Sequence, residues 1–141
     1  MDSARYGTTI VLVNLLVNIV HGAAHLKLHI DLSAAETLFV AIAIVAGPLL
    51  AMALLWTRWQ RLGFGLLALT MAGSLVFGLY HHFMAMGPDH VGAQVPGFWG
   101  TTFVITACLL FLVESVGAFA GVWFLKWGRT PVLRGSSRTR S

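Results

Sequence analysis

Long uncharged stretches divide this chain into four hydrophobic segments. Residues 6–26, 37–57, 62–88 and 90–113 contain no Asp, Glu, Lys or Arg. Each stretch is long enough to cross a hydrocarbon core of about 30 Å as an α-helix that rises about 1.5 Å per residue. The apolar residues follow one another without the alternation of a membrane β-strand, which excludes a barrel. The pattern predicts membrane-spanning helices near residues 8–30, 34–56, 62–85 and 98–125.

The connections between these predicted helices are short. Residues 31–33 and 57–61 join the first three helices, and residues 86–97 form a longer loop before the fourth. Short connections place consecutive helices side by side and antiparallel. We therefore expect an all-α integral membrane protein, with a single four-helix transmembrane domain over 1–125. The basic segment 126–141 is expected to be a disordered cytoplasmic tail attracted to anionic lipid.

Composition removes the main alternatives to a membrane protein. Hydrophobic residues make up 57% of the 141 residues and charged residues only 10%, against about 25% charged in a soluble domain. Too little charge is available to cover a water-facing surface, so a soluble domain, a disordered chain and a nucleic-acid-binding module are excluded, despite a net charge of +4. The single cysteine, Cys108, excludes a disulfide framework and a multi-cysteine metal site.

The basic residues predict the orientation in the membrane. Eight of the nine fall on one side of the predicted bundle: Arg5, Arg58, Arg61, Lys126, Arg129, Arg134, Arg138 and Arg140. Only Lys27 lies toward the other side. The positive-inside rule then places both termini in the cytoplasm, and we expect a multi-pass protein of the bacterial inner membrane. A cleaved signal peptide ending near Gly22 is rejected, because Asn14, Asn18 and His21 interrupt its hydrophobic core.

Polar residues form a stripe along the first predicted helix. The stripe consists of Asn14, Asn18, His21, His25 and His29. At about 100° per residue, these positions fall within an arc of about 80°. Polar side chains inside a span normally face the bundle interior or a functional cavity. Hydrogen bonding between helices is a sufficient explanation for the two asparagines, whereas three imidazoles on successive turns favour a functional site.

The other three histidines lie in the same outer half of the molecule, at His81, His82 and His90, together with the carboxylates of Asp31, Glu36 and Asp89. By helical rise, His25, Glu36 and His81 reach a common level, about 26–28 Å from the cytoplasmic ends. His81 is favoured over His82 because it shares a helix face with Ser74 and Gly78. The predicted metal ligands are His21, His25, Glu36 and His81. The predicted outer or supporting groups are His29, Tyr80, His82, Asp89 and His90.

Imidazoles and a carboxylate at one level suit zinc, copper or iron. No named metal motif is present, so the pattern does not identify the ion. A haem b electron-transfer subunit is the alternative, with axial ligands drawn from His21, His25 and His81. In either case the chemistry lies toward the extracytoplasmic face.

A second polar level lies deeper in the predicted bundle. Glu114 is the only formal charge embedded in a predicted span, away from its ends, at the depth of Asn14. It either hydrogen-bonds to Asn14 or belongs, with Asn18, to a proton or ion path. Gly117 and Gly121 form a GxxxG pattern that allows close helix approach, within the bundle or with a second copy or partner subunit.

The leading hypothesis is a multi-pass membrane protein with a His/carboxylate metal site, used for metal handling or for metal-dependent chemistry. The lipid bilayer is its expected surrounding, and no nucleic-acid partner is expected. An ion conductor and an accessory subunit of a larger membrane complex remain as alternatives. The sequence does not decide whether the protein is an enzyme.

Overall fold

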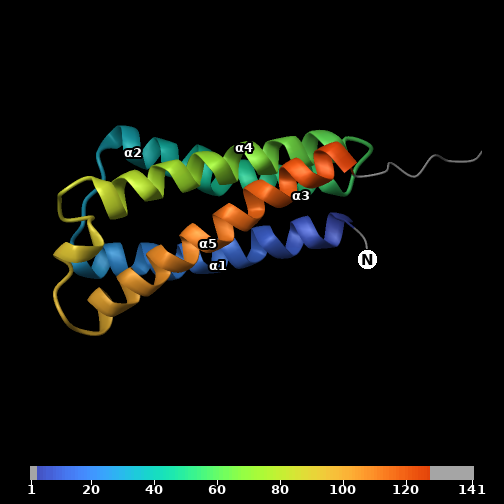
Figure 1. Ribbon diagram of the computed structural model, residues 1–141. Helices are drawn as coiled ribbons and strands as arrows, with labels where there is room; N and C mark the ends of the chain where they lie inside the picture. The colour runs from blue at the N-terminus through green and yellow to red at the C-terminus, as the bar shows by residue number, and fades with distance from the viewer. Residues whose placement is uncertain (1–2, 128–141) are drawn as a thin grey trace, which may run out of the picture.

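The computed structural model describes residues 3–127, which are helical between short connections. Four helices are long and apolar enough to cross a membrane: Ser3–Leu28, Ala34–Leu55, Gln60–Met84 and Phe98–Trp127. They run alternately up and down, and both ends of the described chain lie at the same end of the molecule (Figure 1). The all-α class and the four apolar helices are confirmed. The expected tail lies outside the described residues from position 128 onward.

Two of the four spans are composite. The elements in chain order are α1 (Ser3–Leu28), α2 (Ala34–Phe39), the π-helix η1 (Val40–Ala46), α3 (Gly47–Leu55), α4 (Gln60–Leu79), the π-helix η2 (Tyr80–Met84), the 3₁₀ turn η3 (Val91–Ala93) and α5 (Phe98–Trp127). The second span therefore joins α2, η1 and α3, and the third joins α4 and η2.

A proline explains the widened turn in the second span. Pro48 has no N–H to donate, and its ring would clash with the carbonyl four residues earlier in a regular α-helix. The preceding residue, Gly47, instead donates its N–H to the Ile42 carbonyl, five residues back. A widened π turn relieves the clash.

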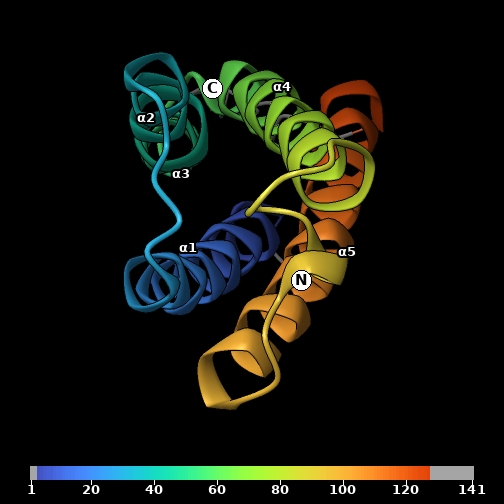
Figure 2. The same ribbon diagram turned by 90° about the vertical axis from the view of Figure 1, so that its left-hand side faces the viewer.

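The helices form an open ring when viewed along the bundle (Figure 2). Helix α5 packs against both α1 and α4, α3 packs against α4, and α1 meets the second span chiefly through α3. The main core, which includes Val11, Leu55, Phe64, Leu67 and Met71, lies toward the end that holds the termini. The α2–η1 half of the second span has only slight contact with α1.

The GxxxG pattern of α5 is used inside the chain. Gly117 and Gly121 are both buried. A β carbon at Gly121 would lie 2.7 Å from the backbone nitrogen of Ala68, and one at Gly117 would lie 2.8 Å from the Met71 side chain. The small-residue face of α5 therefore packs against α4, and it is not free at the surface of the described chain.

The C-terminus of α1 ends in a Schellman-type cap. His29 adopts a left-handed conformation with φ 53°, and the Ile30 N–H donates to the His25 carbonyl at 3.0 Å. Ile30 then packs with Ala24 and Phe103, the hydrophobic contact that commonly accompanies this motif. The cap fixes the last turn of α1, which carries His25.

Candidate metal centre

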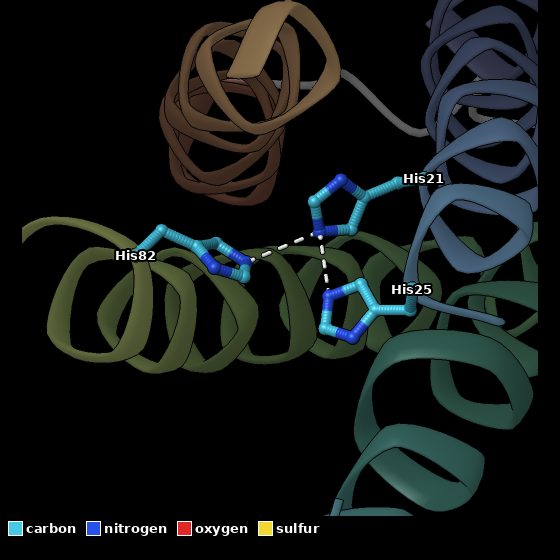
Figure 3. Close-up of side chains that lie close together, drawn as sticks. All are labelled: His21, His25 and His82. Carbon is cyan, nitrogen blue, oxygen red and sulfur yellow. Dashed lines mark hydrogen bonds between the residues drawn. The ribbon is translucent and has the colours of Figure 1, made fainter. Parts of the chain in front are cut away.

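Three histidines from two spans meet at the end of the bundle opposite the termini (Figure 3). His21 and His25 project from consecutive turns of α1, and His82 projects from η2. The Nε2 atom of His21 lies 3.2 Å from Nε2 of His25 and 3.3 Å from Nε2 of His82. One ring nitrogen from each of the three residues lies within 4.8 Å of the others, so the group could hold a metal ion.

The structure brings His82, and not His81, to this cluster. In a regular α-helix, His81 would lie about 20° from the direction of Ser74 and His82 about 80° away. The third span widens at this point into η2, where Ala85 donates its N–H to the Tyr80 carbonyl at 2.7 Å. A π turn rotates the chain by less than 100° per residue. His82 therefore lies closer to the Ser74 face than it would in a regular α-helix. His82 is 6% exposed and lies among buried groups.

His81 and Glu36, both expected in the metal site, instead face each other. Nε2 of His81 lies 3.6 Å from Oε1 of Glu36. The same carboxylate accepts the Ser33 N–H at 2.7 Å, while Ser33 Oγ accepts the Glu36 N–H at 3.3 Å. This reciprocal pair is a capping box. Glu36 is thus engaged in starting α2, away from the His21–His25–His82 cluster.

The remaining expected outer groups lie around the cluster without joining it. His29 is exposed at the α1 cap. Nδ1 of His90 accepts the Gly92 N–H at 3.0 Å and caps η3. The Tyr80 ring packs edge-on against His81, with centroids 5.1 Å apart. Asp89 is the one member of the expected outer set, besides His82, that reaches the cluster, where it contacts His25 and His82.

Hydrogen bonding fixes the tautomer of His21. The Thr106 hydroxyl donates within α5, where its Oγ1 lies 2.7 Å from the Thr102 carbonyl and 3.0 Å from that of Phe103. It must therefore accept the proton of His21 Nδ1, which lies 2.8 Å away. The lone pair of His21 is then on Nε2, the atom that faces the other two rings. No sequence signal distinguished Thr106 as this partner.

A tight turn carries Asp89 to the cluster. His90 donates its N–H to the Gly87 carbonyl at 3.1 Å, which closes a β-turn with Pro88 at its second position. Nδ1 of His82 lies 3.1 Å from the Asp89 carbonyl and 3.2 Å from its Oδ1. A proton on His82 Nδ1 is donated to the Asp89 carbonyl, with Oδ1 at ion-pair distance, and leaves Nε2 with a lone pair. With these tautomers, the Nε2 atoms of His21 and His82 face each other with two lone pairs; the contact drawn in Figure 3 is a hydrogen bond only when one of them carries a proton.

The carboxylate of Asp89 also balances the site electrostatically. Its Oδ1 lies 3.2 Å from Nε2 of His25. Burial by itself raises the pKa of Asp89, but the hydrogen bond and charge of His82, with the charges of His25 and His21, outweigh it and hold the pKa below its usual value. Asp89 thus supplies negative charge to the cluster.

The cluster contains polar atoms that lack partners. Among the described residues, Nδ1 of His25 and both carboxylate oxygens of Asp89 are buried without a well-formed hydrogen bond. Buried polar groups are normally satisfied. Phe103 packs against all three imidazoles, with ring centroids 4.8, 5.1 and 5.4 Å away. The Phe103 ring therefore covers one side of the cluster, while polar atoms of His25 and Asp89 lack hydrogen-bond partners.

The deeper polar residues lie below the cluster on α1 and α5. Asn18 donates its amide to the Asn14 backbone carbonyl at 3.0 Å. The Asn14 side chain is fully buried, and neither of its polar atoms has a partner among the described residues. Glu114 is 4% exposed, and no hydrogen bond joins it to Asn14 or to another described residue. Both therefore remain unpaired within the described chain.

Comparison with protein-family models, with curated proteins and with solved structures finds no match to this chain. Its function must be argued from its own geometry. That geometry consists of four apolar helices and a three-histidine cluster that could bind a metal ion.

Proposed function

We propose that this is a membrane protein that binds one transition-metal ion through Nε2 of His21, His25 and His82. One observation carries the proposal. The two nitrogen separations of 3.2 and 3.3 Å are close to the edge of a tetrahedron around a zinc ion, about 3.3–3.4 Å for Zn–N bonds of about 2.0–2.1 Å. Imidazole ligands are also compatible with copper and iron.

The groups around the three rings support this assignment. Metal-binding imidazoles normally donate their other ring N–H to an oxygen acceptor, a carboxylate, a backbone carbonyl or water. Thr106 serves His21 in this way, and Asp89 serves His82. A cation among the three Nε2 atoms would also relieve the opposed lone pairs of His21 and His82. Three protein ligands leave a coordination position for a water molecule or a small ligand.

The same packing favours an ion over a haem. A macrocycle needs an open plane between two axial ligands. Here the His21 ring meets those of His25 and His82 edge-on at centroid distances of 4.8 and 4.9 Å, and Phe103 closes the adjoining side. A single ion needs no such plane.

We further propose that the cluster faces away from the cytoplasm. By the bounds of the helices, Arg5 lies at the start of α1, Arg58 and Arg61 at the junction of α3 and α4, and Lys126 at the end of α5, all at the end that holds the termini. The positive-inside rule assigns that end to the cytoplasm. Metal would then be taken up from the extracytoplasmic side, for handling or for chemistry at the membrane surface.

Metal analysis of purified protein tests the proposal. The wild-type protein in detergent is loaded with zinc, copper or ferrous iron, desalted and analysed for bound metal. We expect one equivalent of one of these ions, lost in His82→Ala and in His21→Ala. His81→Ala is the matched control, because His81 is the neighbouring residue of the same type on the same π-helix.

The control also discriminates between the two candidate ligand sets. Retention of metal in His81→Ala and Glu36→Gln, with loss in His82→Ala, supports the cluster. Loss of metal in His81→Ala and Glu36→Gln, with retention in His82→Ala, would show that His81 and Glu36 bind the ion and His82 does not. No bound metal in the wild type with any of the three ions would overturn the proposal.

A further inference from the structure

A cavity of about 400 Å³ adjoins the histidine cluster. Its walls come from α1, the second span, the third span and α5. Apolar side chains, among them Ile44, Leu75, Leu110 and Phe111, form most of its lining. His21, His25, His82 and Asp89 lie along one wall. A cavity of this size, mainly apolar with a few polar groups, is typical of a small-molecule site.

Residues of α1 and of the α2–η1 half of the second span both line the cavity, and these two segments have little contact with each other. Gly22 of α1 lines it, and a β carbon at Gly22 would meet no atom within 4 Å. Leu26, also on the rim, is 78% exposed. Leu26 lies in the last turn of α1, and in a membrane-spanning bundle apolar side chains exposed on the outside of a helix contact lipid. A molecule that enters here therefore comes from the hydrophobic phase.

Glu114 is the polar group that the lining does not otherwise explain. It belongs to the cavity wall, is 4% exposed and has no hydrogen-bond partner among the described residues. An isolated carboxyl group in an apolar site is costly unless a proton or a donor group satisfies it. A head group inside the cavity that can form a hydrogen bond to this carboxyl group, such as a hydroxyl or an amine, would satisfy it.

Gly78 connects Glu114 to the histidine cluster. A β carbon at Gly78 would lie 4.0 Å from Oε2 of Glu114 and 3.6 Å from Cδ2 of His82. A small group next to Gly78 can therefore touch the carboxylate and the edge of the cluster at once. The absence of a side chain at Gly78 keeps this space open.

We propose that the cavity binds a small lipid-soluble molecule with an apolar body and one hydrogen-bond-donating head, a hydroxyl or an amine, which pairs with Glu114. The apolar body occupies the space among Ile44, Leu75 and Leu110, and the head lies beside His82. The proposal that the molecule binds next to Glu114 depends only on the cavity and its lining residues. That the head is presented to a metal ion rests on the proposed function.

Photolabelling with matched probes tests this assignment. The full-length protein in phosphatidylcholine nanodiscs is exposed to diazirine derivatives of octanol, octylamine and octane, and labelled residues are mapped by mass spectrometry. We expect octanol or octylamine to label cavity residues about tenfold more than octane, the ratio that a hydrogen bond to a carboxylate would give. The octanol and octylamine arms distinguish a hydroxyl from an amine ligand.

Three variants complete the test. Glu114→Leu should abolish the preference for octanol or octylamine over octane, and Gly78→Leu should reduce labelling by all probes. Ser115→Ala, on the next residue of α5 and outside the cavity lining, should change neither. Equal labelling by all three probes in the wild type, or a preference that survives in Glu114→Leu, would overturn the assignment.

Metal content measured on the same samples separates the two proposals. Wild-type protein that holds metal but shows no probe preference contradicts only the Glu114 site. Protein that shows the preference but binds no metal contradicts only the metal centre. Since Glu114 is not a proposed ligand, Glu114→Leu should retain its metal.

Discussion

The position of one proton on His21 determines which of its nitrogens faces the cluster. The Thr106 hydroxyl uses its own hydrogen within α5 and accepts from Nδ1 of His21 at 2.8 Å, which leaves Nε2 unprotonated. A single hydroxyl on a different helix thus prepares the central nitrogen of the site. Such supporting partners commonly contribute 10–100-fold to metal affinity.

Thr106→Val removes this acceptor while keeping the shape of the side chain. We expect the affinity for the bound ion to fall by about 10–100-fold, measured by competition with a chromogenic chelator. Thr106→Ser should restore it, because the hydroxyl is retained. Equal affinities in the wild type, Thr106→Val and Thr106→Ser would contradict the role of this hydroxyl.

His29 has a conformational role distinct from that of the cluster. Its φ of 53° is unfavourable for a residue with a β carbon, by about 1–2 kcal/mol. Glycine adopts this conformation readily at helix C-termini. We expect His29→Gly to raise the melting temperature, by the equivalent of about 1 kcal/mol after the entropy cost of glycine, with unchanged metal content. A lower melting temperature or loss of metal would show that His29 belongs to the site.

The choice between His81 and His82 shows where residue-level prediction from sequence stops. The i, i+4 spacing of His21 and His25 on a helix predicts correctly that both side chains converge. The same helical geometry applied to the third span favours His81, because it assumes 100° per residue up to the end of the span. The π turn over Tyr80–Met84 changes that angle. No residue type in this segment predicts a π turn.

At the scale of the elements, α5 holds the site together. It packs against α1, which carries His21 and His25, and against α4, which leads into η2 and His82, and it contributes both Phe103 and Thr106. Close packing between α5 and α4 depends on Gly121, where a β carbon would lie 2.7 and 2.8 Å from backbone atoms of Ala68. Backbone atoms cannot move aside as a flexible side chain can.

Gly121→Ala should therefore destabilise the protein by about 1–3 kcal/mol, the usual cost of overpacking. Gly65→Ala on α4 is the matched control, since the nearest atom to its β carbon would be Leu125 Cδ2 at 3.8 Å. Thermal unfolding in one detergent compares the two variants with the wild type. Equal melting temperatures for Gly121→Ala and Gly65→Ala would contradict the packing argument.

Sequence patterns predict the elements better than the connections between them. Uncharged stretches place all four long apolar helices within a few residues of their observed ends, since a helix that could cross lipid must be long and apolar. They do not predict the π-helices, which depend on local packing and on Pro48. The turn at Gly87–His90 brings Asp89 onto the cluster, and that contact depends on the path of a loop, which helical periodicity does not describe.

At the scale of the whole molecule, most basic residues and the histidine cluster lie at opposite ends of the bundle. The basic residues of the described chain other than Lys27 occupy the end with the termini, and the histidine cluster occupies the other. This polarity is the basis for the proposed orientation. In the proposed orientation, most of the bilayer would separate the histidine cluster from the cytoplasmic surface.

Cysteine accessibility tests that orientation. In a Cys108→Ser background, Gly87→Cys and Thr57→Cys place single thiols at exposed positions at opposite ends. We expect a membrane-impermeant maleimide to label Gly87→Cys in intact cells and Thr57→Cys only after the membrane is permeabilised. The reverse pattern would place the histidine cluster on the cytoplasmic side.

X-ray absorption spectroscopy of the metal-loaded protein tests the central claim most directly, because it counts the imidazoles around the ion. The account predicts three imidazole ligands at about 2.0–2.1 Å if the ion is zinc. In His82→Ala, any residual bound ion should show two, and in His81→Ala it should still show three. One imidazole or none in the wild type, or the same count in His82→Ala as in the wild type, would contradict a metal centre built from His21, His25 and His82.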